Sequence, residues 1–177
     1  MRLIAIAAAA LMLAGCAEPT PTAAVATTTA TATEPAFGGT DLAWIEVALA
    51  LDEQLLPLLD AIPAHTATPA VTSLAAQVRT LTDAELPQLR ALHDRAGLPA
   101  DNPHVGMPMP GMVTAEELKT MTALPGTAFD RAALDKLREG ITQSIALARG
   151  EQDHGADQAT RTLAGTVLTT RSALPVG

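Results

Sequence analysis

The sequence predicts an all-α protein, a four-helix bundle made of two helical hairpins with a long Met/Pro-containing connection. Four long segments after residue 40 carry apolar residues at three- and four-residue steps, which is the spacing of one helix face. No run of five residues there alternates strictly between apolar and polar, so no strand is predicted. Short turns separate the helices of each pair, and a much longer segment joins the pairs.

The first sixteen residues have the pattern of an export signal. Arg2 precedes the apolar run 3–13, which is shorter than the roughly 20 residues that a membrane-spanning helix needs. The run leads into Leu13-Ala14-Gly15-Cys16, which resembles the bacterial lipobox, where the Cys sulfur is acylated and the chain is cut before it. We therefore expect residues 1–15 to be a lipoprotein signal peptide and Cys16 to carry lipid. An ordinary secretory signal with an incidental Cys is the alternative.

Two acyl chains give stable membrane anchoring, so the mature protein is expected on the outer face of the cell membrane or the periplasmic side of the envelope. Residues 16–36 follow as a Thr/Ala/Pro-rich tether without apolar periodicity. Such a composition does not bury enough surface to offset its ordering entropy. We expect a disordered spacer, followed by a helical bundle domain over residues 37–177.

The first hairpin has a start and a stop signal at each helix. Thr40-Asp41 supplies an N-cap and an acidic first turn, and Pro63 is expected to end the first helix. Thr68-Pro69 then supplies an N-cap with proline at the first helical position, and Gly97 ends the second helix. The two apolar stripes are Trp44, Ala48, Leu51, Leu55, Leu58, Leu59 and Ile62, and then Val71, Leu74, Ala75, Val78, Leu81, Leu89 and Leu92.

The connection and the second hairpin have similar signals. Residues 100–111 have the composition of a loop, and Thr114 with Glu117 forms a capping box for a short helix through Met121. Gly126-Thr127 with Asp130 opens the third long helix, and Gly150 and Gly155 mark its end and the turn. The apolar residues of these last two long helices are Phe129, Ala133, Leu137, Ile141, Ile145 and Ala148, and then Leu163, Val167, Leu168 and Leu174.

Composition and motifs exclude several functions. The 11 basic and 19 acidic residues give a net charge of −8, and only 2% of residues are aromatic, which argues against nucleic-acid binding. The single Cys excludes an internal disulfide and a multi-cysteine zinc site. No phosphate loop, Gly-x-Ser-x-Gly or His-Glu-x-x-His is present. Glu-x-x-His occurs once, from Glu151 to His154, and lacks the second copy that a di-metal site needs. We expect a protein that is not an enzyme.

The connection holds the best candidate for chemistry. Met107, Met109 and Met112 follow His104 within one loop. Thioether sulfurs are soft ligands that select Cu(I), and an imidazole can complete such a site. The sequence therefore suggests a copper or other soft-metal site at these four residues. The alternative is that the methionines fill gaps between the loop and the bundle.

The centre of the chain is similar to a known family. Met109-Pro110-Gly111-Met112, Thr114-Ala115-Glu116-Glu117-Leu118 and Gly126-x-x-Phe129-Asp130-Arg131 resemble the bacterial exported family called domain of unknown function 305. The resemblance covers roughly residues 41–174 and implies a ferritin-like bundle of two repeats. Family members carry a His-His pair in the first helix of each repeat, and a Gln with a Glu three residues later in the second. Those positions here read Leu51-Asp52 and Gly140-Ile141, then Thr82 with Glu85 and Arg171 with Leu174.

The resemblance therefore implies a degenerate member that has lost the family's presumed metal ligands, with Glu85 retained. Some members are linked to copper handling, which agrees with the Met-containing loop. Asp52 takes an inward-facing position, so Asp52 and Glu85 are a candidate buried polar pair, and Asp52 needs a partner because an unpaired buried carboxylate is costly. Two functions stay open, namely soft-metal binding through the loop, or a metal-free bundle that serves as a structural or protein-interaction module in the envelope.

Overall fold

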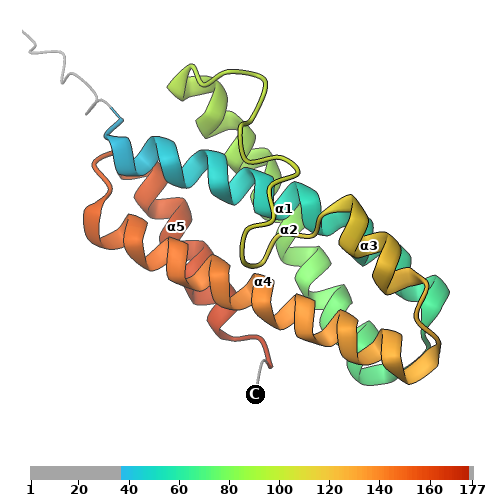
Figure 1. Ribbon diagram of the computed structural model, residues 1–177. Coiled ribbons are helices and arrows are strands. Elements are labelled where there is room, and N and C mark those ends of the chain that lie inside the picture. The colour runs from blue at the N-terminus through green and yellow to red at the C-terminus, as the bar shows by residue number, and fades with distance from the viewer. Residues whose placement is uncertain (1–36, 176–177) are drawn as a thin grey trace, which may run out of the picture. The chain divides into compact units, whose positions relative to one another are not determined.

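The computed structural model describes residues 37–175, which form five helices and contain no strand. The helices are α1 (Gly39–His65), α2 (Pro69–Ala96), α3 (Ala115–Thr122), α4 (Gly126–His154) and α5 (Gln158–Ser172). Figure 1 shows α1 and α2 as one hairpin and α4 and α5 as another, with α3 on the connection beside α1 and α4. The all-α bundle predicted from the sequence is confirmed. The predicted signal peptide, Cys16 and the predicted tether lie outside the described residues.

Several predicted helix signals are confirmed. Thr68 is the N-cap of α2 with Pro69 at its first position, and Gly97 ends α2 in the left-handed conformation with φ of +66°. The capping box of α3 forms in both directions. The Glu117 amide donates to Thr114 Oγ1 at 3.2 Å, and the Thr114 amide donates to Glu117 Oε2 at 2.8 Å. These signals act within one turn of helix, so the sequence alone determines them.

Both predicted boundaries of the first helix are wrong. The N-cap of α1 is Gly38 rather than Thr40, and α1 continues through Pro63 to His65. A proline this close to the helix end removes only one backbone donor, so the helix can continue past it. The Thr66 amide still donates to the Ile62 carbonyl at 3.1 Å and closes the last turn. The start of α4 at Gly126 agrees with the predicted Gly126-Thr127 signal, with Pro125 as N-cap, and Asp130 accepts from the Thr68 hydroxyl at 2.6 Å.

The last two helices also differ in detail from the prediction. Gly150 lies inside α4, and only Gly155 follows its end. Asp157 is the N-cap of α5 and accepts from the Thr160 amide at 2.8 Å. No described helix combines the length and the apolar character needed to cross a membrane.

The bundle interior has two apolar clusters on either side of a polar layer. One cluster surrounds Phe129 and the other surrounds Trp44. Along each long helix, one or two buried polar residues separate the two clusters. These positions are Asp52 on α1, Thr82 and Glu85 on α2, Ser144 on α4 and Arg171 on α5.

The connection crosses the seam between α1 and α4 at Gly111. Its φ is +84°, and a Cβ there would lie 2.9 Å from Gln143 Cβ and 3.1 Å from Leu51 Cδ1. Glycine is required twice, once for the backbone conformation and once for the close approach. This crossing holds the loop 104–112, which contains the predicted soft-metal ligands, against the bundle.

We expect Gly111→Ala to lower the free energy of unfolding by about 2 kcal/mol or more, because backbone strain and steric overlap add. Gly106→Ala is the matched control, since Gly106 has a φ of +79° and a Cβ there would meet nothing within 4 Å. It should cost only the strain, on the order of 1 kcal/mol. Urea titration of both variants measures the difference, and equal losses would show that the crossing is not tightly packed.

Candidate functional site

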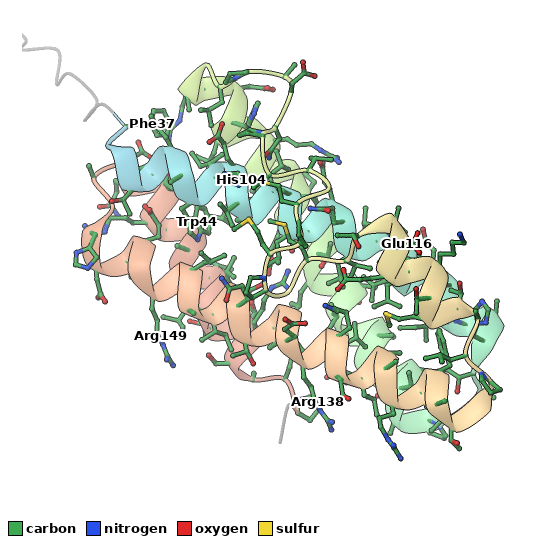
Figure 2. All side chains as sticks on the ribbon, in the orientation of Figure 1. Phe37, Trp44, His104, Glu116, Arg138 and Arg149 are labelled. Atoms are coloured by element: carbon green, nitrogen blue, oxygen red, sulfur yellow. The ribbon has the colours of Figure 1, made fainter. Side chains whose placement is uncertain are left out.

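The candidate metal loop, residues 104–112, is organised by one side chain of α1. Gln54 Nε2 lies 3.5 Å from the His104 carbonyl and 3.1 Å from Met112 Sδ, and Gln54 Oε1 accepts from the Gly106 amide at 3.0 Å. The backbone turns of the loop bring Met107 back toward His104, with its amide 3.2 Å from the His104 carbonyl. Both ends of the loop therefore meet at a single amide group, and Figure 2 labels His104 on this loop. No motif in the sequence predicts this role for Gln54.

The four predicted ligands differ in exposure. Met107 is 44% exposed, and Met112 is 1% exposed within the cluster of Val47, Ala50 and Leu51. Met109 is half-buried against the same cluster. The Nδ1 atom of His104 is buried and has no hydrogen-bond partner among the described residues. Met112 therefore fits the gap-filling alternative, whereas His104 presents an unused ligand atom.

The second candidate, the buried pair Asp52 and Glu85, is held by a guanidinium. Arg171 Nη2 lies 2.7 Å from Asp52 Oδ1 and 2.5 Å from Glu85 Oε2, and Arg171 Nε lies 3.1 Å from Glu85 Oε2. Thr82 Oγ1 lies 3.3 Å from the same Nη2. Arg171 is fully buried, so all these bonds form away from water. Arg171 stands at a family position in the sequence, but nothing in the sequence marks it as the partner that Asp52 needs.

The polar layer carries one more acid than base. Burial raises the pKa of Asp52 to about 7, with Arg171 opposing the shift and Glu85 adding to it. Asp52 Oδ2 and Arg171 Nη1 have no partner among the described residues. A cavity of about 10 Å³ borders the layer between Asp52, Ser144 and Trp44, which is close to the space that one water occupies. The layer therefore holds an extra proton readily near neutral pH.

The remaining motif, Glu-x-x-His, does not form a metal site. Glu151 is buried and His154 is exposed. Within residues 37–175, no group of three or more His, Cys, Asp or Glu side chains is arranged to hold a metal ion. Methionine is not among those residue types, so the soft-metal site predicted at His104, Met107, Met109 and Met112 stays a prediction.

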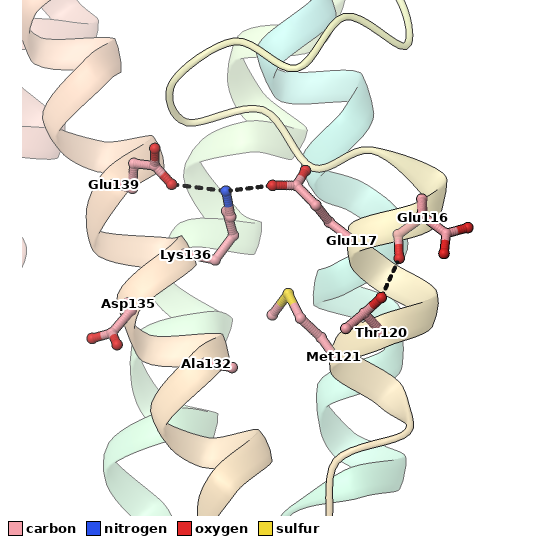
Figure 3. Close-up of a pocket in the computed structure, with 8 residues that line it drawn as sticks. All are labelled: Glu116, Glu117, Thr120, Met121, Ala132, Asp135, Lys136 and Glu139. Atoms are coloured by element: carbon pink, nitrogen blue, oxygen red, sulfur yellow. Dashed lines mark hydrogen bonds and ion pairs between the residues drawn. The ribbon is translucent and has the colours of Figure 1, made fainter.

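A surface groove of about 520 Å³ lies between α3 and α4 (Figure 3). Met121 and Ala132 give it an apolar floor. The ammonium of Lys136 lies between the two helices, with Nζ 3.2 Å from Glu117 Oε1 on α3 and 2.8 Å from Glu139 Oε2 on α4. Burial opposes charge on Lys136, but its hydrogen bonds to Glu139 and Glu117 hold its pKa above the ordinary value. The ammonium is thus tied to its carboxylates and leaves the rim of the groove acidic.

Comparisons with known proteins agree on the family. The model of domain of unknown function 305 (DUF305) matches residues 41–173. A crystal structure of a DUF305 fragment from Deinococcus radiodurans is 21% identical, with a TM-score of 0.69, and the match covers 78% of this chain and 91% of that one. A DUF305 protein from Streptomyces coelicolor, described as secreted, is 18% identical with a TM-score of 0.65, covering 76% and 84%.

No curated protein matches the chain. The two solved structures share its fold, and the family model spans nearly all of the described bundle, from the third residue of α1 to the residue after α5. The resemblance seen in the Met-Pro-Gly-Met connection is therefore confirmed over the whole domain, and the chain belongs to the DUF305 family.

Proposed function

We propose that this protein is an exported, lipid-anchored envelope protein whose helical domain binds Cu(I), without catalysis, through the loop 104–112. The observation that carries the proposal is the buried, unpartnered Nδ1 of His104, in a loop whose other end, Met112 Sδ, reaches the same Gln54 amide. An imidazole nitrogen with two or three thioethers is a ligand set that favours Cu(I) over harder cations.

Export and anchoring are supported by the sequence before the domain. The apolar run and Leu13-Ala14-Gly15-Cys16 fit a lipoprotein signal, and a structural relative is described as secreted. Lipid on Cys16 would place the domain at the membrane without a spanning helix. The lipid anchor is tested by growing cells with a labelled fatty acid. The parent protein should incorporate the label, and the Cys16→Ser variant should not.

The interior of the bundle is a poor place for the metal. The guanidinium of Arg171 already lies at bonding distance from both Asp52 and Glu85. A metal ion would have to displace a buried cation that is covalently part of the chain and then leave that cation without a partner. The loop is therefore a better place for a metal ion than the polar layer.

The second candidate function is a metal-free module for structure or protein interaction. It is supported by the nearly complete burial of Met112, whose sulfur already has a packing role. Such a module would offer the acidic α3–α4 groove to a partner with basic and apolar side chains. The titration below separates the two candidates.

The test is a competition titration with a Cu(I) chelator, using the chain from residue 16 with Cys16→Ser so that no thiol competes. We expect one equivalent of Cu(I) to bind, and we expect this binding to be lost in the triple variant Met107→Leu, Met109→Leu, Met112→Leu. Leu for Met conserves volume and usually costs less than about 1.5 kcal/mol, so the fold should persist.

Met121→Leu is the matched control, because Met121 is a buried methionine of α3 outside the loop. It should leave Cu(I) affinity unchanged. His104→Asn should weaken binding without abolishing it. If the triple variant binds Cu(I) as the parent does, the loop is not the site and the metal-free module is the better interpretation.

A further inference from the structure

We propose that Asp41 and Glu151 share one proton and act as a pH-sensitive latch that holds the start of α1 on the α4–α5 connection. Both side chains are almost completely buried, with exposed fractions of 0% and 1%. Asp41 comes from the first turn of α1 and Glu151 from the last turn of α4. This pair lies outside the loop 104–112 and outside the polar layer.

Asp41 is the acceptor at the centre of the latch. Its carboxylate accepts the Gly38 amide at 2.6 Å, the Ala156 amide at 3.0 Å and the Asp157 amide at 3.0 Å. The first bond closes the N-terminus of α1, and the other two cross 115 and 116 residues of sequence to the α4–α5 connection. A single ionised carboxylate therefore joins the two hairpins at this end of the bundle.

Glu151 lies against this acceptor without a cation. Neither carboxylate forms an ion pair with a Lys, Arg or His in the part of the chain that the structure describes. Neither oxygen of Glu151 accepts a hydrogen bond from a group that the structure describes. A Cβ at Gly155 would overlap Glu151 Oε1, so the absent side chain makes room for the carboxyl group. The two carboxyl groups are within hydrogen-bonding reach of each other. Two adjacent buried carboxylates do not both ionise, so Glu151 keeps its proton and donates a hydrogen bond to Asp41.

The electrostatics of each group agree with that assignment. Burial would raise the pKa of Asp41, but the hydrogen bond from Glu151 and those from the three amides outweigh it and keep the pKa below its ordinary value. Burial, the hydrogen bond to Asp41 and the Asp41 charge raise the pKa of Glu151 to about 8. The pair thus carries one negative charge at neutral pH.

The neighbouring charges modulate the pair without replacing the proton. On α5, Arg161 attracts the ionised form of Glu151, and the helix's N-cap Asp157 repels it. Asp157 itself is paired with Arg95 of α2 at 2.5 Å, so the Arg95 guanidinium is engaged with Asp157 rather than with the latch. On α4, the exposed His154 lines the same open groove of about 580 Å³ as Glu151, which gives the pair access to solvent protons.

Loss of the shared proton should therefore open this end of the bundle. Above about pH 8, Glu151 would ionise beside Asp41 in a buried site, and the repulsion would be relieved by separating α1 from the connection. The three amides bound to Asp41 report that opening directly.

The test is amide hydrogen exchange by NMR on the chain from residue 16 with Cys16→Ser. The protection factors of the Gly38, Ala156 and Asp157 amides are expected to fall up to tenfold per pH unit above about pH 8, because one proton is linked to opening. The buried Leu137 of α4 serves as an internal reference that should not follow this fall.

Glu151→Gln is the matched variant, because it keeps a donor in place at every pH and nearly the same volume. It should abolish the alkaline loss of protection, whereas Asp41→Asn should lower protection at all pH values. A carbon-13 titration of the Glu151 carboxyl in the parent protein should show a midpoint near pH 8. The proposal is overturned if the parent shows no alkaline loss, if the Gln variant shows the same loss, or if Glu151 titrates at its ordinary pKa.

Discussion

Replacing Arg171 with methionine is expected to lower the free energy of unfolding by about 3–5 kcal/mol at neutral pH. Arg171 is fully buried and is the partner of both Asp52 and Glu85. Its removal leaves two buried carboxylates that repel each other and have lost their cation. Urea titration of Arg171→Met measures the loss, and Arg149→Met, at an exposed position on α4, is the control that should change stability by less than about 0.5 kcal/mol.

The same variant should recover part of its stability on acidification, because protonation removes the charges that lack a partner. Combining Arg171→Met with Asp52→Asn and Glu85→Gln should restore most of the loss at neutral pH, since breaking a buried ion pair costs more than replacing it. If Arg171→Met lowers the free energy of unfolding by less than about 1 kcal/mol, the polar layer is solvated or rearranged. A metal ion could then enter the layer without leaving a buried cation unpaired.

The helices could be predicted because their signals are local. Apolar spacing and the Thr68-Pro69 and Thr114/Glu117 caps depend on residues within one or two turns, and the structure retains them. The start of α1 could not be placed in this way. Asp41 does not sit in the first turn merely as a favourable charge, because its carboxylate also binds amides more than a hundred residues away.

The candidate sites show the same limit. Asp52 and Glu85 were identified from family positions, but their cation comes from α5, 86 residues beyond Glu85, and only packing shows that the three meet. The Met cluster was visible as a composition, yet its residues range from 44% exposed Met107 to 1% exposed Met112. Exposure depends on how the connection crosses α1, and Gln54, which sets that crossing, has no sequence signature.

Stability should be highest on the acidic side of neutrality and should fall as the pH rises toward 8. Asp52 and Glu151 have ordinary pKa values of 3.8 and 4.5, which the fold raises to about 7 and about 8. At a pH between the ordinary and the raised pKa of either group, that carboxyl has lost its proton in the unfolded chain but keeps it in the folded chain. Raising the pH in this range therefore favours unfolding. Each group contributes at most about 1.4 kcal/mol per pH unit in its own window.

The opposite contribution comes from carboxylates whose pKa the fold lowers. Asp41, Asp157 and Glu117 are hydrogen-bonded as anions, so their stabilisation is present above their ordinary pKa values and is lost as the pH falls further. The two effects together place the maximum of the free energy of unfolding at about pH 4 to 5, close to the ordinary pKa values of these carboxyl groups. Urea midpoints measured at intervals from about pH 3 to about pH 9 give the full profile.

Single variants show which carboxyl group causes the loss of stability at rising pH. Glu151→Gln should flatten the profile most between about pH 7 and 8, where Glu151 alone still retains in the folded protein a proton that the unfolded chain has released. Asp52→Asn should flatten it mainly below about pH 7. A parent profile that is level from about pH 5 to 8 would mean that both carboxyl groups ionise normally in the folded protein. That result would count against both the shared proton at Glu151 and the tight closure of the polar layer, because both depend on carboxyl groups whose burial raises their pKa.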